Sequence, residues 1–254
     1  VVHGGEAFDR AVVVDEPGLD AIRRSVVLAP LHNPANLLGI EACRQQWPAV
    51  PQVAVFDTAF HQTLPEAAFR YAIPSAAYRE HGIRRYGFHG TSFAYITWYL
   101  AEHWGRPRAE LNLIVLHLGN GASACAIRNG RSIDTSMGMT PLAGLMMGTR
   151  CGDIDPGVLL YWQERLGAGA AEVSCWLNRD SGLKGIAGTN DMRDVLAASG
   201  ADPAADLALA MYAHRLRHYI GAYRAQLPQL DALVFTGGIG EHAAPVREHA
   251  CRGL

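Results

Sequence analysis

Charged residues and long apolar runs are both scarce in this 254-residue sequence. Only 18% of its residues are charged, and 22 Lys and Arg against 24 Asp and Glu give a net charge of −2. This near balance offers no basic surface for nucleic acid or for an anionic membrane. Apolar stretches such as Leu111–Leu118 are far too short to span a bilayer. Hydrophobic residues nevertheless make up 49% of the chain, which argues against disorder because a sizeable core can form.

Cysteines are few, odd in number and unpaired in sequence. No CxxC motif occurs, which argues against a zinc site and against a disulfide scaffold. We therefore expect reduced thiols in a cytoplasmic protein, each acting as a small buried hydrophobic side chain. The five positions are Cys43, Cys125, Cys151, Cys175 and Cys251.

Repeats and low-complexity tracts are also missing, which argues against solenoids and propellers. At about 150 residues per domain, the length corresponds to one large domain or two modest ones. The chain begins Val1-Val2-His3-Gly4-Gly5, as if in the middle of a strand, and it stops just after a helical pattern. We expect a piece of a longer protein.

Strand-like runs alternate with helical spacing, which predicts an α/β fold with a mixed sheet. The Asn129-Gly130 pair predicts a type I′ hairpin turn. A domain boundary is expected near Asp57. The predicted strands are Ala11–Val14, Val53–Phe56, Leu111–Leu118, Ser123–Arg128, Arg131–Asp134 and Leu233–Phe235, the last one buried. The predicted helices are Leu19–Ser25, Ala35–Trp47, Thr91–Trp104, Gly157–Leu166, Ala204–Ala225 and Pro245–Ala250. Asn33 and the Thr91-Ser92 pair are the expected caps of the second and third helices.

Two glycine loops follow predicted strands. His117–Ser123 reads HLGNGAS, and Thr236–Glu241 reads TGGIGE ahead of a helix. Such loops let backbone N–H groups approach a phosphate, so two of them favour a nucleotide site. Neither loop matches GxGxxG or the Walker A pattern. An ordinary tight turn is the alternative for the first loop.

A polar segment, Met147–Gly157, contains Arg150 between glycines. The guanidinium could present its planar fork to a carboxylate or phosphoryl group, or it could form a structural salt bridge with Asp153 or Asp155. Both aspartates are expected to cap the helix that follows.

Further candidates are an aspartate at a strand end and two histidines. Asp57 ends a strand where carboxylates commonly face a ligand cleft. His89 precedes a helix, where its neutral form could donate a hydrogen bond, and His32 stands before the Asn-Pro pair. For each histidine a structural role is the alternative. His214 and His218 have the spacing of helical metal ligands, but no HExxH motif surrounds them, so solvent or subunit contacts are favoured.

Taken together, these segments resemble the acetate kinase family of the sugar kinase/Hsp70/actin superfamily. The matching stretches occur in family order along the whole chain. They are Val1–Glu6, Ala29–Ile40, Val53–Gln62, Tyr86–Ser92, His117–Ser123, Asp134–Leu142, Gly148–Pro156 and Val234–Glu241. The resemblance implies a two-domain actin-like ATPase fold, related to ribonuclease H and truncated at both ends. Residues 1–57 would complete the first kinase domain, and residues 58–254 would form the incomplete second domain.

The resemblance implies reversible phosphorylation of acetate by ATP with Mg²⁺ or Mn²⁺, through direct in-line transfer, in a cytoplasmic homodimer that associates through the second domain. Because acetate is already ionised at pH 7, no general base is needed. Alternatives are a propionate or butyrate kinase of the same family and a non-catalytic nucleotide-binding fragment. A Rossmann oxidoreductase is disfavoured, since its glycine pattern and acidic ribose partner are missing.

Site roles follow from the resemblance residue by residue. Arg150 and His89 would stabilise the transferring phosphoryl group, Asp57 would organise the metal–phosphate centre through water, and His32 and His117 would support the site. The pocket for the acetate methyl would comprise Val2, Leu31, Phe88 and Pro141. The ATP site would comprise His117, Leu118, Gly119, Asn120, Gly121, Asp191, Met192, Arg193, Gly237, Gly238, Ile239 and Gly240.

The sequence departs from the family pattern at three positions. Phe93 replaces a second histidine, Ala143 replaces a common glutamate, and Cys151 replaces a common serine. The arginine before Val1, the N-terminal phosphate loop and the C-terminal glutamate that binds the metal are absent from these residues. We therefore expect the 254 residues alone to have little or no kinase activity.

Overall fold

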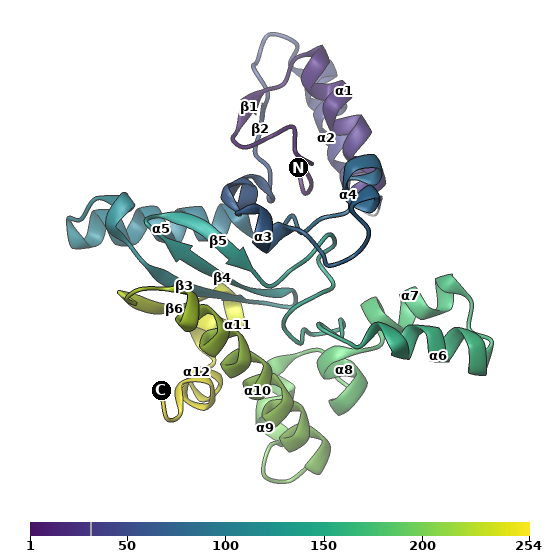
Figure 1. The fold of residues 1–254 in the computed structure, drawn as a ribbon, viewed down its shortest axis with the longest axis vertical. Helices are drawn as coiled ribbons and strands as arrows, with labels where there is room; N and C mark the ends of the chain where they lie inside the picture. The colour runs from purple at the N-terminus through teal and green to yellow at the C-terminus, as the bar shows by residue number, and fades with distance from the viewer. Residues whose placement is uncertain (31) are drawn as a thin grey trace. The chain divides into compact units, whose positions relative to one another are not determined.

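The computed structural model describes residues 1–30 and 32–254 and has a mixed α/β architecture (Figure 1). An antiparallel two-stranded sheet pairs β1 (Val12–Val13) with β2 (Val53–Ala54), with Val12 opposite Ala54. A second sheet has the strand order β5-β4-β3-β6. Its strands are β3 (Leu113–Leu118), β4 (Ala122–Arg128), β5 (Arg131–Thr135) and β6 (Ala232–Thr236).

Helices fill most of the remaining described chain, and every predicted helix is present. The α-helices are α1 (Glu16–Arg24), α2 (Asn33–Gln46), α3 (Glu66–Phe69), α4 (Ser75–His81), α5 (Gly90–Trp104), α6 (Pro156–Leu166), α7 (Ala170–Arg179), α8 (Gly182–Ala187), α9 (Met192–Ala198), α10 (Pro203–Gln226), α11 (Gly237–His242) and α12 (Ala244–Cys251). The 3₁₀ helices are η1 (Ser25–Leu28), η2 (Ala59–Thr63) and η3 (Arg108–Glu110). In the described part of the chain, no helix combines the length and apolar character that crossing a membrane requires.

The chain forms two compact units. The first comprises Val1–Leu113 with Ile127–Thr140, and the second comprises Ile114–Ala126 with Pro141–Leu254. The boundary at Asp57 was predicted for the two domains of the complete family fold, and it stays a prediction.

Strand β3 and its hairpin partners follow the sequence pattern closely. All residues of β3 except His117 are fully buried, as its continuous apolar run predicts for a strand covered on both faces. Asn129 and Gly130 join β4 to β5 with φ values of 53° and 71°. Both positive angles are those that a type I′ turn requires, so the predicted hairpin is confirmed.

Two predictions about burial are wrong. Strand β6 is half-buried along its whole length, because it is an edge strand of the four-stranded sheet. Of the five cysteines only Cys125 is buried, since it alone lies on a covered strand, and the other four are partly exposed. All five are free thiols.

The predicted helix caps are only partly correct. Asp155 caps α6, because its carboxylate accepts from Gly157 N–H at 2.8 Å. Asp153 instead accepts from Gly144 N–H at 2.7 Å, outside any helix start. The Thr91-Ser92 pair does not cap α5, because that helix already begins at Gly90.

Asn33 was also predicted as a cap, but it lies inside α2, which His32 precedes. Its side chain is fully buried and bonds both backbone groups of His3. The Asn33 Oδ1 atom accepts from His3 N–H at 3.0 Å, and Nδ2 donates to His3 O at 2.8 Å. Buried backbone N–H and C=O groups need hydrogen-bond partners, and Asn33 supplies them to His3 instead of capping α2.

Each unit has its own packed core. In the first, Phe8, Ile22, Ala54 and Phe56 form one cluster, with the Phe8 and Phe56 rings stacked at 4.1 Å. In the second, the long helix α10 packs against α8, α9 and α12. Its buried residues follow helical spacing: Ala205, Ala208, Tyr212, Ala213, Leu216, Ile220 and Tyr223.

Two fully buried histidines lie in the first unit. Burial lowers the pKa of both His3 and His61 to about 4, because a charged imidazole would lose its hydration there. Both rings are therefore neutral at pH 7.

We expect acid to destabilise the first unit through these histidines. The unfolded chain binds protons near pH 6.5, whereas the folded rings resist them until about pH 4, so stability is present above 6.5 and falls toward 4. Between pH 7.5 and 5.0 each ring should cost about 2 kcal/mol of unfolding free energy. Urea unfolding at both pH values measures the loss. The exposed His218→Gln variant should keep the same pH dependence; unfolding free energies that do not change with pH would contradict the assignment.

Candidate active site

Asp57 and His89 meet at the start of helix α5 in the first unit. His89 N–H donates to Asp57 Oδ2 at 2.9 Å, and Gly90 N–H donates to the Asp57 carbonyl at 2.8 Å. His89 adopts a left-handed backbone with φ 57°. This conformation is unfavourable for a residue with a side chain and is typical of functional positions.

The Asp57 carboxylate is half-buried. Burial raises its pKa, and the hydrogen bond from His89 N–H partly opposes that shift because it favours the ionised form. A protein site that binds a metal ion by itself needs several ligand side chains close together. The described residues contain no cluster of three His, Cys, Asp or Glu that could hold an ion. A Mg²⁺ ion that is bound together with phosphates needs only one or two protein carboxylates as ligands, and Asp57 could supply one of them.

The predicted methyl-pocket residues lie partly in the same unit. Phe88 is fully buried next to His89, and its ring meets the His3 ring edge-on at 5.6 Å. Val2 N–H donates to Asn36 Oδ1 at 3.0 Å on helix α2, whose first turn His32 precedes. Leu31, the third predicted member, lies outside the described residues.

Arg150 belongs to the second unit and has no carboxylate partner there. Its Nη1 atom donates to the Pro141 carbonyl at 3.0 Å and lies 3.7 Å from Met147 Sδ. Among the described residues no ion pair to Asp153 or Asp155 exists, so the structural salt bridge is not formed. Burial lowers the pKa of this guanidinium, since its charge is partly desolvated. A half-buried cation without a counter-ion is suited to an anionic ligand.

The segment that carries Arg150 is tied to the first glycine loop. Gly148 N–H donates to the Asn120 carbonyl at 3.0 Å. A Cβ atom on Gly148 would lie only 2.0 Å from Asn120 Oδ1, which also accepts from Asn190 Nδ2 at 3.2 Å. A side chain at position 148 would therefore have to displace the Asn120 side chain and its hydrogen bond with Asn190.

A pocket of about 490 Å³ opens in the second unit between the glycine loops and helix α9. Three segments that are distant in sequence line it. Of the predicted ATP-site residues it contains Gly119, Asn120, Asp191, Met192, Arg193, Gly238 and Ile239. It does not contain His117, Leu118, Gly121, Gly237 or Gly240.

Among the five residues that do not line the pocket, Gly237 packs closely against Leu118. Gly237 has φ 76°, and a Cβ on it would lie 2.7 Å from the Leu118 carbonyl, so this glycine lets α11 start directly against β3. Leu118 is fully buried, and burial lowers the pKa of the neighbouring His117.

Asp191 and Arg193 shape one edge of the pocket. Asp191 caps α9 by accepting from Arg193 N–H at 2.9 Å, and the two side chains form an ion pair. The Arg193 side-chain and backbone hydrogen bonds hold the pKa of Asp191 down to about 2. The carboxylate therefore stays ionised at any physiological pH.

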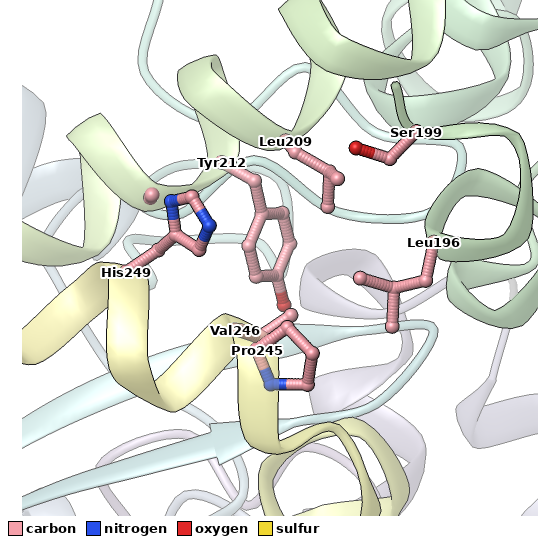
Figure 2. Close-up of a pocket in the computed structure, with 8 residues that line it drawn as sticks. Leu196, Ser199, Leu209, Tyr212, Pro245, Val246 and His249 are labelled. Carbon is pink, nitrogen blue, oxygen red and sulfur yellow. The ribbon is translucent and has the colours of Figure 1, made fainter. Parts of the chain in front are cut away.

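Four lining residues were not predicted from the sequence: Asn190, Leu196, His242 and Ala243. Leu196 stands one helical turn after Met192, so helical spacing could have identified it. Leu196 also lines a second cavity of about 280 Å³ with Ser199, Leu209, Tyr212, Ala213, Pro245, Val246 and His249 (Figure 2). No sequence motif indicated this cavity.

A glycine-loop pocket together with a partly buried, unpaired guanidinium is suited to a nucleotide-dependent phosphotransferase. Comparison with known proteins agrees with this class. The sequence profile of the Acetokinase family matches residues 1–254, and the chain belongs to that family.

Individual relatives support the same assignment. The chain is 57% identical to an acetate kinase of Syntrophobacter fumaroxidans and 60% identical to one of Leifsonia xyli, each across its full length. It spans only 62% and 64% of those two proteins.

Solved structures agree closely in fold. A crystal structure of Porphyromonas gingivalis acetate kinase matches with a TM-score of 0.96 and 46% identity, covering 100% of this chain and 64% of its own. A propionate kinase from Francisella tularensis matches with a TM-score of 0.96 and 49% identity, covering 100% and 66%. These neighbours show the predicted actin-like ATPase fold.

Replacing Gly148 by alanine should destabilise the protein by about 1–3 kcal/mol, because the new methyl group would displace the Asn120 side chain. Thermal unfolding of the complete encoded protein measures this loss. Gly221→Ala in the middle of α10 is the matched control, since nothing lies within 4 Å of its Cβ position. That variant should gain up to about 1 kcal/mol. Equal behaviour of both variants would contradict the packing argument.

Proposed function

We propose that the protein containing this chain is an acetate kinase, which transfers the γ-phosphoryl group of ATP to acetate and also runs in reverse. The observation that carries the proposal is the 490 Å³ pocket. There the two glycine loops meet the segment Asn190–Leu196, as an adenine nucleotide would require. Family membership of the whole chain supports the same reading.

The transfer we propose is direct. A carboxylate oxygen of acetate attacks the γ-phosphorus in line with the bond to the bridging β–γ oxygen. That bond breaks, ADP leaves with its electron pair, and acetyl phosphate forms. Because acetate is ionised at pH 7, the protein mainly has to align two anions and offset their repulsion.

Three side chains would divide this work. Arg150, which forms no ion pair with the described residues, would bind the equatorial oxygens of the transferring group. His89 would donate a hydrogen bond to the same group. Asp57 would help to hold Mg²⁺ or Mn²⁺, whose charge offsets that of the phosphates when the ion is bound. His32 and His117 would support the site around them.

The acceptor is proposed to be a short carboxylate whose methyl group meets Val2, Leu31, Phe88 and Pro141. Propionate is the second candidate, since the Francisella tularensis neighbour is a propionate kinase at 49% identity. One methylene in an apolar pocket changes binding by only about 1–3 kcal/mol, so the two substrates are close competitors.

We also propose a cytoplasmic homodimer that associates through the second kinase domain. The five free cysteines support a reducing compartment. The alternative is a module that binds nucleotide without turnover, and it predicts ATP affinity with no acetyl phosphate. Light scattering of the purified protein measures the subunit number.

The proposal is tested on the complete encoded protein with ATP, Mg²⁺ and acetate, with acetyl phosphate trapped as its hydroxamate. We expect product formation, with kcat/KM highest for acetate among acetate, propionate and butyrate. A higher value for propionate would shift the assignment to the second candidate. ATP binding without any acyl phosphate would overturn the kinase proposal itself.

Arg150→Ala should lower kcat by about 100-fold or more, because a preorganised charge at the transferring group is lost. The thermal midpoint should change little, since Arg150 makes no ion pair with the described residues. Arg165→Ala, at an exposed position on α6, is the matched control and should keep full activity. Equal rates for both variants would remove Arg150 from the mechanism.

A further inference from the structure

A buried histidine outside the predicted site supports the turn that carries His89. The His61 ring has no solvent exposure, and both its nitrogens have partners. Nε2 lies 3.0 Å from the Phe88 carbonyl, and Nδ1 lies 2.8 Å from Ser132 Oγ. A carbonyl can only accept, so Nε2 carries the proton and Nδ1 accepts from the serine hydroxyl. The tautomer of His61 is thereby determined.

The turn is packed directly against this ring. Gly87 has φ 77°, and a Cβ there would lie 2.6 Å from His61 Cδ2 and 2.5 Å from Thr135 Cγ2. Gly87 N–H donates to the Gly138 carbonyl at 3.2 Å. The chain therefore passes His61 with no room for a side chain, immediately before Phe88 and His89.

The left-handed backbone of His89 needs such support. A non-glycine residue in this region is strained unless its surroundings impose the conformation. Two hydrogen bonds hold the peptide group between Phe88 and His89. Asp57 accepts from its N–H, and His61 donates to its carbonyl. Without the second contact the peptide between Phe88 and His89 could rotate.

We propose that His61 is a positioning residue for His89: by holding the Phe88 carbonyl, it fixes the backbone from which the His89 side chain reaches the transferring phosphoryl group. This inference rests on the proposed kinase function. His61 is fully buried inside the first unit and would act on His89 through the backbone that it holds.

Phe93 contributes to the same packing. Its fully buried ring meets the His61 ring edge-on at 5.6 Å. This apolar ring adds no hydrogen bond, and among the described residues His61 is hydrogen-bonded to Ser132 Oγ and to the Phe88 carbonyl.

The test compares His61→Phe with His61→Gln in the complete encoded protein. Phenylalanine keeps the ring volume but removes both hydrogen bonds, whereas glutamine can still donate to the Phe88 carbonyl. We expect His61→Phe to lower kcat by about tenfold or more, because small misplacement of a reacting group slows transfer strongly. The KM values for acetate and ATP should stay within about threefold. His61→Gln should recover most of kcat.

Thr97→Val is the matched control. Thr97 is fully buried on helix α5, which begins directly after His89, and its hydroxyl donates to the Phe93 carbonyl at 2.7 Å. This variant also loses a buried hydrogen bond, so its thermal midpoint should fall while kcat stays unchanged. If His61→Phe behaved like Thr97→Val, or raised KM alone, or if His61→Gln recovered nothing, the positioning role would be overturned.

Hydrogen exchange supplies a readout that does not depend on activity. The amides of His89 and Gly90, both bonded to Asp57, should lose protection in His61→Phe but keep it in Thr97→Val. If wild-type protein formed no acyl phosphate, the proposed function would fail. The exchange rates would still decide whether His61 holds this turn, and unchanged protection would overturn that.

Discussion

The candidate site depends on close approach of one backbone segment to another. Gly90 leaves only 2.4 Å between a hypothetical Cβ and the Asp57 carbonyl oxygen, and Gly237 leaves 2.7 Å to the Leu118 carbonyl oxygen. Backbone N–H groups can stabilise an anion only if they are held still, because a mobile dipole must reorganise as charge develops. Glycine permits the approach, and buried hydrogen bonds then keep the segments in place.

The charges in the second unit are consistent with an anionic ligand. Arg150 is partly desolvated yet has no carboxylate partner among the described side chains, whereas Arg193 is paired with Asp191 at the pocket edge. A paired arginine is already neutralised, so its value to a phosphate is smaller. Asp57 has a raised pKa that the His89 amide opposes, which leaves a carboxylate held by a single backbone donor.

Two side chains that were predicted to cap helices form other hydrogen bonds in the structure. Asn33 was predicted to cap a helix, but its side chain is hydrogen-bonded to both the N–H and the carbonyl of His3. Asp153 matched a cap but bonds Gly144, and its other oxygen accepts from Tyr219. In each case a polar side chain met a buried or distant backbone group, and local preference could not reveal that partner. His61 carried no motif of its own, although its burial and its two hydrogen bonds make it central to the His89 turn.

The sequence by itself determined the α/β class, the buried strand β3 and the type I′ turn at Asn129-Gly130. These depend on periodicity and on glycine, whose effects act over a few residues. Only the tertiary structure decided that Asn190, Leu196 and His242 line the glycine-loop pocket, that Arg150 has no ion pair in the described chain, and that β6 is a half-buried edge. Those outcomes depend on contacts between residues far apart in the chain, where the burial of one group determines which partner another can reach.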